Sequence, residues 1–471
     1  DVPTLLRELE RVREPKRPRW TWAAASIGGA AIAASVAVGF LVAPRPAQAD
    51  ACEDVMSELE SIWNDERRAE LRGAFGTRKA GDGMQDWAGR WLAVRAQECE
   101  AAKSAERDTE PTACSASLRD RFQATVHAFR TPHLREGLSY ASVIAKLPAP
   151  EHCIDHPDDA EWGYGGLLEL RDIDVEVEAL AGIGDLEVAS ARQRDYMTLA
   201  RELGSDYGVA RSIFWRGEIF RLEGQLAEAD QDFELAYGMA WELGLGVFGA
   251  EVQMKLAAVA GALGKVEAVD AYALMARAVL AEYRPDRVAE LLQVHGLGLV
   301  AGPDSTVRER GVDLLLRAVE MREAELTQHR GTRELLSEAH ENYARGLLAV
   351  DRAGEALEYL DMALRVHQEE FGHGSWRTRG ILLQKFRAVL ELRRFSQADL
   401  LFQAVLEIDA DAANWSRYVE DAFWFADGYA DAGRAGSAVS VLRAGRLIAK
   451  ENSLMNDVAR FDSELAGLAT E

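Results

Sequence analysis

Residues 210–243 read ARSIFWRGEIFRLEGQLAEADQDFELAYGMAWEL, and this stretch decides the fold of the chain. Ile213, Gly217 and Phe220 recur at helical spacing in its first half, and a turn is expected at Gly224. The second half carries four apolar residues at the same spacing: Leu226, Ala229, Phe233 and Ala236. The stretch therefore predicts two paired helices that touch at small residues and bury large ones against neighbouring pairs.

The same spacing recurs with a period of about 40 residues, which is typical of a helical solenoid. The recurring positions are Leu186 and Ala189; Ala257, Gly264, Val266, Ala273 and Ala276; Leu291, Leu292, Val294, Gly311, Leu315 and Ala318; Ala344, Leu347, Ala356, Leu360 and Ala363; Phe386, Val389, Phe395, Ala398, Phe402 and Val405; Ala426, Tyr429, Gly433, Ala438 and Leu442. They make up roughly seven units between Leu170 and Ser453. We therefore predict an all-α chain with an array of tetratricopeptide (TPR) type over residues 165–471.

Composition supports a helical, globular chain and argues against nucleic-acid binding. Apolar residues make up 48% of the 471 residues, charged residues 28% and aromatic residues 8%. Runs of alternating Val, Ile and Thr are absent, so a β architecture has little support. The formal net charge is −24, and such a surface repels phosphate, which Lys and Arg must neutralise.

A transmembrane helix is predicted over residues 20–43, where Trp20 is followed by TWAAASIGGAAIAASVAVGFLVA. The segment carries no charge and is long enough to cross a hydrocarbon core of about 30 Å. Residues 1–19 contain five basic side chains, Arg11, Arg13, Lys16, Arg17 and Arg19. By the positive-inside rule, residues 1–19 are a cytoplasmic juxtamembrane segment and the remainder lies outside the cytoplasm. In a bacterium this places the protein in the inner membrane, with its C-terminal region in the periplasm.

Two further interpretations attach to this segment. Ala47-Gln48-Ala49 resembles the small-residue site that ends a cleaved signal peptide, which is the alternative to a retained anchor. Ala31, Ser35 and Gly39 lie four residues apart, and small residues at that spacing let two membrane helices approach closely. A homodimer paired through the membrane helix is therefore a possible partner arrangement.

The four cysteines, Cys52, Cys99, Cys114 and Cys153, all lie between the apolar segment and the repeats. An even number clustered in an exported region predicts two disulfides, so we expect a small disulfide-stapled helical region over residues 50–160. Three pairings are possible, and the simplest joins sequence neighbours, Cys52 to Cys99 and Cys114 to Cys153. The alternative for the last cysteine is a zinc site with His152, Asp155 and His156, but no CxxC partner motif accompanies it.

Ligand binding in such arrays falls on the concave face, which the first helix of each pair lines. Projecting the spacing places these residues there: Arg211, Phe214, Glu218 and Arg221; Glu338, Glu341 and Arg345; Leu383 and Arg387; Glu420, Phe423 and Asp427. Both signs of charge and two aromatic residues are present, and no unit stands out. We expect a protein or peptide partner, and the alternative is a solvated face without a ligand.

Motifs of catalysis are not found in the sequence. A phosphate-binding GxxxxGK[ST] loop, a GxSxG elbow, an HExxH zinc motif and the kinase HRD and DFG motifs are all missing. Neither a cofactor nor a metal is therefore expected for this chain. His373, in EFGHGSW, resembles the histidine of the loop between repeats of kinesin-light-chain type, and a turn role is expected there.

The order of these parts resembles bacterial receptor-like serine/threonine protein kinases, which combine a cytoplasmic kinase domain, one membrane helix, a four-cysteine region and TPR repeats. The similar stretches are Val2-Pro3-Thr4-Leu5-Leu6-Arg7-Glu8-Leu9, Cys52 with Ile62-Trp63-Asn64, Trp91 with Cys99, and Cys114 with Leu147-Pro148 and Cys153. Asn64 departs from the Asp of the family pattern. The resemblance implies an extracytoplasmic sensor region, with a kinase domain that uses ATP and Mg²⁺ upstream of Asp1. The alternative is a membrane-anchored TPR scaffold without a kinase.

Overall fold

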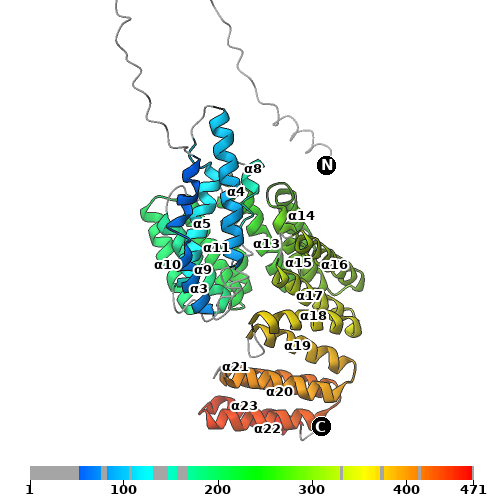
Figure 1. Ribbon diagram of the computed structural model, residues 1–471. Coiled ribbons are helices and arrows are strands. Elements are labelled where there is room, and N and C mark those ends of the chain that lie inside the picture. Colours follow the sequence, from blue (N-terminus) through cyan, green and yellow to red (C-terminus); the bar gives the residue numbers. More distant parts are fainter. Residues whose placement is uncertain are drawn as a thin grey trace, which may run out of the picture. The chain divides into compact units, whose positions relative to one another are not determined.

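The computed structural model describes residues 52–75, 82–105, 109–130, 147–155, 157, 168–328, 332–371, 376–411 and 415–468. Within these ranges every regular element is a helix. From Leu168 onward the helices form seven consecutive antiparallel pairs, α9–α10 to α21–α22, followed by α23. Figure 1 shows the last of these helices, α19 to α23, stacked side by side.

The helices of the array begin and end at the following residues. They are α9 (Leu168–Ile183), α10 (Leu186–Glu202), α11 (Asp206–Leu222), α12 (Leu226–Glu242), α13 (Gly246–Ala262), α14 (Val266–Tyr283), η2 (Pro285–Arg287), α15 (Val288–Val300), α16 (Ser305–Thr327), α17 (Arg333–Ala349), α18 (Ala353–Phe371), α19 (Trp376–Glu391), α20 (Phe395–Asp411), α21 (Trp415–Asp431), α22 (Ala435–Glu451) and α23 (Met455–Leu468). The protein is a TPR-like helical solenoid.

Short left-handed turns join the first helices of the array. Gly184, Gly204, Gly224, Gly244 and Gly264 all have a positive φ of 65–80° and occur every 20 residues. At such a turn the backbone N–H groups after the helix return to its last carbonyls, as Ser205 N–H does to Ala200 O at 2.9 Å. Three later turns place Asp351, Arg393 and Ser453 in this conformation instead. A side chain there costs free energy that glycine does not.

Within a pair, the two helices touch where the sequence predicts small residues. A Cβ on Gly217 of α11 would lie 3.1 Å from the side chains of Asp232 and Phe233 on α12. Ala229, on the same side of α12, is fully buried together with Phe233 and Ala236. The helices α11 and α12 can therefore approach closely, because the residues at their contact are small.

Successive pairs are joined by each even-numbered helix packing on the next odd-numbered helix, and also by contacts between odd-numbered helices. We call the odd-numbered helices the odd layer (α9, α11, α13, α15, α17, α19, α21 and α23). Each odd helix from α9 to α19 contacts the next odd helix. The approach is closest between α13 and α15, where a Cβ on Gly261 would lie 2.6 Å from the Gly298 Cα. The backbones of these two helices therefore pack almost directly on each other.

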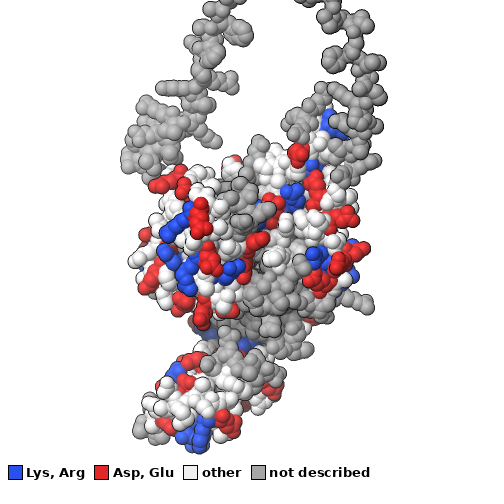
Figure 2. All heavy atoms as spheres, turned by 90° about the vertical axis from the view of Figure 1, so that its left-hand side faces the viewer, with Lys and Arg blue, Asp and Glu red and all other residues white. Residues whose placement is uncertain are grey.

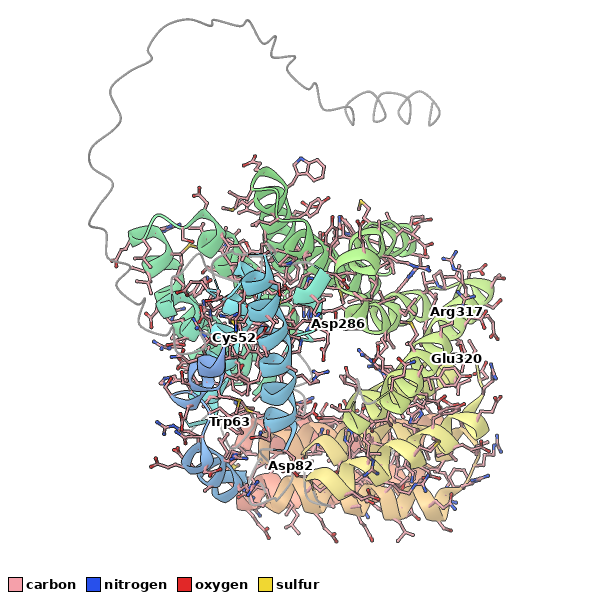
Figure 3. All side chains as sticks on the ribbon, turned by 45° about the horizontal axis from the view of Figure 1, so that its top comes forward. Cys52, Trp63, Asp82, Asp286, Arg317 and Glu320 are labelled. Carbon is pink, nitrogen blue, oxygen red and sulfur yellow. A yellow bond between two sulfur atoms is a disulfide. The ribbon has the colours of Figure 1, made fainter. Side chains whose placement is uncertain are left out.

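A disulfide-linked helical bundle, which we call the cysteine bundle, precedes the array. It comprises η1 (Glu53–Met56), α2 (Ser57–Glu60), α3 (Asp65–Phe75), α4 (Asp82–Ser104), α5 (Ala113–Arg130) and α8 (His152–Asp155). Trp87 stacks on Phe122 with ring centroids 4.6 Å apart, and its indole N–H donates to Pro148 O at 2.9 Å. Figure 3 labels Cys52 and Trp63, which both belong to this bundle.

The two disulfides join sequence neighbours. Cys52 bonds Cys99, which ties the start of η1 to α4, and Cys114 bonds Cys153, which ties α5 to α8. Because the Cys153 sulfur is bonded to Cys114, it offers no thiolate to zinc, and the proposed ligand His156 lies outside the described residues. In the part of the chain that the structure describes, no group of three or more His, Cys, Asp or Glu side chains could hold a metal ion.

The predicted membrane helix at residues 20–43 lies outside the described residues, as do residues 1–19 and the small-residue positions Ala31, Ser35 and Gly39. Among the residues that are described, we find no helix with both the length and the apolar character needed to span a bilayer. The loop residue His373 also falls outside the described ranges. The membrane anchor and its dimer face therefore stay predictions from sequence.

The close approach of α13 and α15 generates a stability prediction. Gly261→Ala places a methyl group against the Gly298 backbone, which cannot move aside, so we expect a loss of about 1–3 kcal/mol in unfolding free energy. Gly238→Ala, in the interior of α12 with nothing within 4 Å of the new Cβ, is the matched control. The control should gain roughly 0.5–1 kcal/mol, since alanine favours helix. Thermal melting of both variants measures this, and equal melting temperatures would contradict the close approach.

Candidate functional site

A network of buried ion pairs runs across the odd layer at the N-terminal end of the array. Arg211 on α11 is 3% exposed and donates to Asp174 on α9 at 3.0 Å and to Glu251 on α13 at 2.8 Å. The Trp215 indole N–H donates to the same Asp174 oxygen at 2.5 Å. Arg287 reaches the other oxygen of Glu251 at 3.4 Å. One chain of charges therefore connects three successive pairs and the turn that follows them.

A second buried carboxylate, Glu218, lies about two turns after Arg211 on α11. Glu218 accepts hydrogen bonds from Lys255 on α13 at 2.7 Å and from both guanidinium nitrogens of Arg221, at 2.8 and 2.9 Å. Burial would raise the pKa of the Glu218 carboxyl, but the Lys255 charge and the Arg221 hydrogen bond outweigh it and lower that pKa to about 2. Glu218 is therefore ionised at neutral pH, and it forms ion pairs with Lys255 and Arg221 of this chain.

The cysteine bundle covers part of the odd layer at this end. Arg121 on α5 pairs with Glu178 on α9 at 3.6 Å, and Asp120 on α5 pairs with the buried Arg171 on α9 at 3.1 Å. Ala124 of α5 packs in one apolar cluster with residues of α9. The odd layer around α9 is thus already occupied by this chain's own helix α5.

The C-terminal part of the odd layer carries exposed side chains instead. On α21, Glu420, Trp424, Asp427 and Asp431 follow one another at intervals of four, three and four residues and are all exposed. This spacing places them on one face of the helix. The opposite face of α21 holds Ala422, Phe425 and Tyr429, which are buried in the core. We call the exposed row the α21 face.

Burial and negative neighbours raise the pKa of two carboxyls in this part of the layer. Burial raises the pKa of Asp427, and the charges of Glu464 on α23 and Asp431 raise it further. On α17, burial raises the pKa of Glu341 to about 6 despite the nearby Arg345 charge, and Glu338 adds to the effect. Glu420 differs, because Arg460 on α23 grips it with two hydrogen bonds of 2.5 and 3.1 Å. A cation placed beside Asp427 would therefore be attracted by several negative charges.

The structure divides the residues that the sequence projected onto the concave face. Arg211, Glu218 and Arg221 belong to the buried network, and Phe214 is 1% exposed among aromatic neighbours. The exposed or half-buried members are Glu338, Glu341, Arg345, Leu383, Arg387, Glu420 and Asp427.

The aromatic residues of the last units are also divided. Phe423 is buried and stacks on Phe461, with centroids 4.1 Å apart. The neighbouring residue Trp424 is 42% exposed, while one edge of its ring contacts Phe386 of α19. Projection from the repeat spacing did not single out Trp424, because a spacing derived from core positions does not show which of two adjacent aromatic side chains stays outside.

A three-residue ionic junction joins α19, α20 and α21. Arg379 donates to Asp409 at 2.8 Å and to Asp421, so one guanidinium serves two buried carboxyls. Burial and a hydrogen bond with Asp409 raise the pKa of Asp421 to about 7, although Arg379 opposes the shift. Tyr418 also lies near the Asp409 charge, and burial followed by that charge raises its pKa. No sequence motif pointed to this junction.

Nothing in the described ranges has the arrangement of a catalytic centre. His340 is buried against Tyr359, and burial lowers its pKa to about 4. Acidic and basic side chains are interleaved on the face shown in Figure 2. Asp286, labelled in Figure 3, holds Arg284 with two hydrogen bonds of 2.9 and 2.7 Å.

These features define a helical-repeat protein with a charged odd layer. No family model matches the sequence, and no curated protein matches it. Solved structures do match. One is a Rap protein complexed with competence and sporulation factor, at 13% identity, with 76% of this chain and 98% of that chain covered and a TM-score of 0.46.

Two further matches have the same character. The apo form of RapI is 14% identical, with 75% of this chain and 93% of that chain covered and a TM-score of 0.40. Aspartyl phosphate phosphatase F from Bacillus subtilis is 12% identical, with 83% and 94% covered and a TM-score of 0.38. The likeness concerns helical architecture, and at these values neither an activity nor a ligand carries over to this chain.

The ionic junction generates a pH prediction. Asp421 has a pKa near 7 in the folded protein and about 3.9 when unfolded, so the folded state binds more protons between these values. Its contribution to stability is therefore full below about pH 4 and is lost as pH rises through 7. Asp421→Asn imitates the protonated carboxyl. It should therefore remove a pH dependence of the unfolding free energy that corresponds to up to about one proton. Melting temperatures of both proteins from pH 4 to 8 measure this, and parallel curves would refute it.

Proposed function

We propose that this chain is a partner-binding module, whose open odd layer over α17–α23 recognises a protein or peptide. The observation that carries the proposal is the division of the odd layer into two parts. Around α9 the layer is covered by α5, whereas α17 to α23 present exposed charged side chains and an exposed tryptophan. Tryptophan and arginine are the residues that most often dominate binding energy at protein interfaces.

The repeat architecture suits this role. Because each pair contacts mainly its neighbours, the odd layer extends over several units without a single compact core. Some of its side chains are held by their neighbours within the layer: the Asn342 amide on α17 donates to Gln293 Oε1 on α15 at 2.6 Å. A surface whose side chains are already held loses less entropy when a partner docks.

In its finer form, the proposal is that this module is the extracytoplasmic sensor of a single-pass membrane receptor, with a serine/threonine kinase domain upstream of Asp1. The support is the predicted membrane helix at residues 20–43 and the sequence resemblance described above. Two disulfides in the region after that helix suit an oxidising compartment. A membrane-anchored scaffold without a kinase is the competing form.

The location can be tested with a reporter enzyme that is active only after export, fused after Glu471. We expect activity in cells that make the full chain, and loss of activity when residues 20–43 are deleted. Activity only of a reporter that works in the cytoplasm would refute the orientation. The gene sequence upstream of Asp1 then separates the two forms, because glycine-rich loop, HRD and DFG motifs are required by the kinase and not by the scaffold.

Partner binding can be tested by a steric block of the odd layer. Gly380 on α19 and Gly354 on α18 both have open space where a Cβ would lie, with nothing within 4 Å. Gly380→Trp should weaken binding of peptides selected from a random displayed library by at least about tenfold, which is 1.4 kcal/mol. Gly354→Trp, on an even-numbered helix, is the matched control and should bind like the wild type. Equal binding by both variants, or a library that yields no binder, would contradict the proposal.

A further inference from the structure

We propose that the α21 face, together with Glu464 of α23, docks a basic peptide segment of a partner protein. A Lys or Arg side chain of the partner would lie over the Trp424 ring and against the carboxylates of Asp427 and Asp431. This inference rests on the proposed partner-binding function and adds to it the chemistry of the partner.

The first argument is the charge around Asp427. The charges that act on its carboxyl are those of Glu464 and Asp431, both negative, and with burial they raise its pKa. Asp427 therefore carries its charge beside two carboxylates of the same sign, although Glu464 also lies near the Arg460 charge. A partner's cation would relieve this repulsion, whereas a partner's carboxylate would increase it. The favoured occupant is therefore positively charged.

The second argument is the exposed indole in the middle of the same face. Trp424 keeps 42% of its surface exposed, and its ring is tilted by 50° to the Phe386 ring with the centroids 5.6 Å apart. The exposed part of the indole is available to a partner. A guanidinium or ammonium group is attracted to an indole face, and the attraction grows when water is excluded. The protein already uses this geometry on the same helix, where the Arg460 guanidinium lies 4.2 Å from the Phe423 ring centroid.

The third argument is that the neighbouring charges of the layer are already matched. Arg460 holds Glu420 with two hydrogen bonds, and Arg387 of α19 holds Glu391 at 3.2 Å. These two positive side chains are thus engaged with carboxylates of this chain. Asp427 and Asp431 lie about two and three turns after Glu420 on α21, and among the described residues no ion pair is recorded for either of them.

The test uses the full chain in detergent and two fluorescent peptides, one of alternating Arg and Ala and one of alternating Glu and Ala. We expect the Arg–Ala peptide to bind and the Glu–Ala peptide not to bind. The affinity should fall as salt is raised, because the exposed charges are screened. The double change Asp427→Lys and Asp431→Lys should weaken binding by about tenfold or more, and Trp424→Ala by several-fold.

Matched controls separate these effects from general changes of charge or apolar surface. Glu358→Lys and Glu407→Lys together make the same charge change on the even-numbered helices α18 and α20, and Trp241→Ala removes a tryptophan that is 78% exposed on α12. Both controls should bind the Arg–Ala peptide like the wild type. Each variant is first shown to melt like the wild type.

Two results would overturn the inference in different ways. If library-selected peptides are blocked by Gly380→Trp but are neutral or acidic and insensitive to Trp424→Ala, the partner-binding function stands and the basic partner is wrong. If the Arg–Ala peptide binds the α21 variants and the controls equally, its binding is a nonspecific response to net charge and the α21 face is not the site.

Discussion

The close approach of the odd-numbered helices α9, α11, α13 and α15 fixes both the backbone packing and the buried charges of the first half of the array. Between α13 and α15 the approach leaves no room for a side chain at Gly261, and between α9, α11 and α13 it brings Asp174, Arg211 and Glu251 within hydrogen-bond distance. Buried ions are tolerated only when they are paired. Close packing and charge pairing therefore support one another, since a wider separation would leave each of these ions alone in a desolvated site.

Much of the fold was predictable because it follows from spacing. Gly217 and Ala229 predicted where two helices touch, and the period of about 40 residues predicted the array. The disulfides could be anticipated from the number and placement of the cysteines. The glycines that occur every 20 residues are a further signal in the sequence, because they mark left-handed turns such as those at Gly204 and Gly224.

The charged surface was less accessible from sequence. The projection onto the concave face treated Arg211 and Arg387 alike, but the structure buries the first and leaves the second exposed. The difference arises because the Arg211 guanidinium pairs with Asp174 on α9 and with Glu251 on α13, and no repeat pattern encodes a charge network across three helices. The Arg379 junction is hidden for a related reason, since its three members come from three helices and share no sequence spacing.

The residue at the left-handed turn differs from one helix pair to another, and this affects the local stability of the pairs. The turns from α9 to α14 use glycine, as does the later turn at Gly433 between α21 and α22, whereas the turns before α18, α20 and α23 hold Asp351, Arg393 and Ser453 at a positive φ of 56–62°. Each such residue costs about 1–2 kcal/mol in the folded state. In an array with nearest-neighbour coupling, unfolding then begins at the C-terminal pairs and stops toward the stapled end. A partner that binds only the folded C-terminal pairs would stabilise them. Binding would then increase the fraction of molecules in which these pairs are folded.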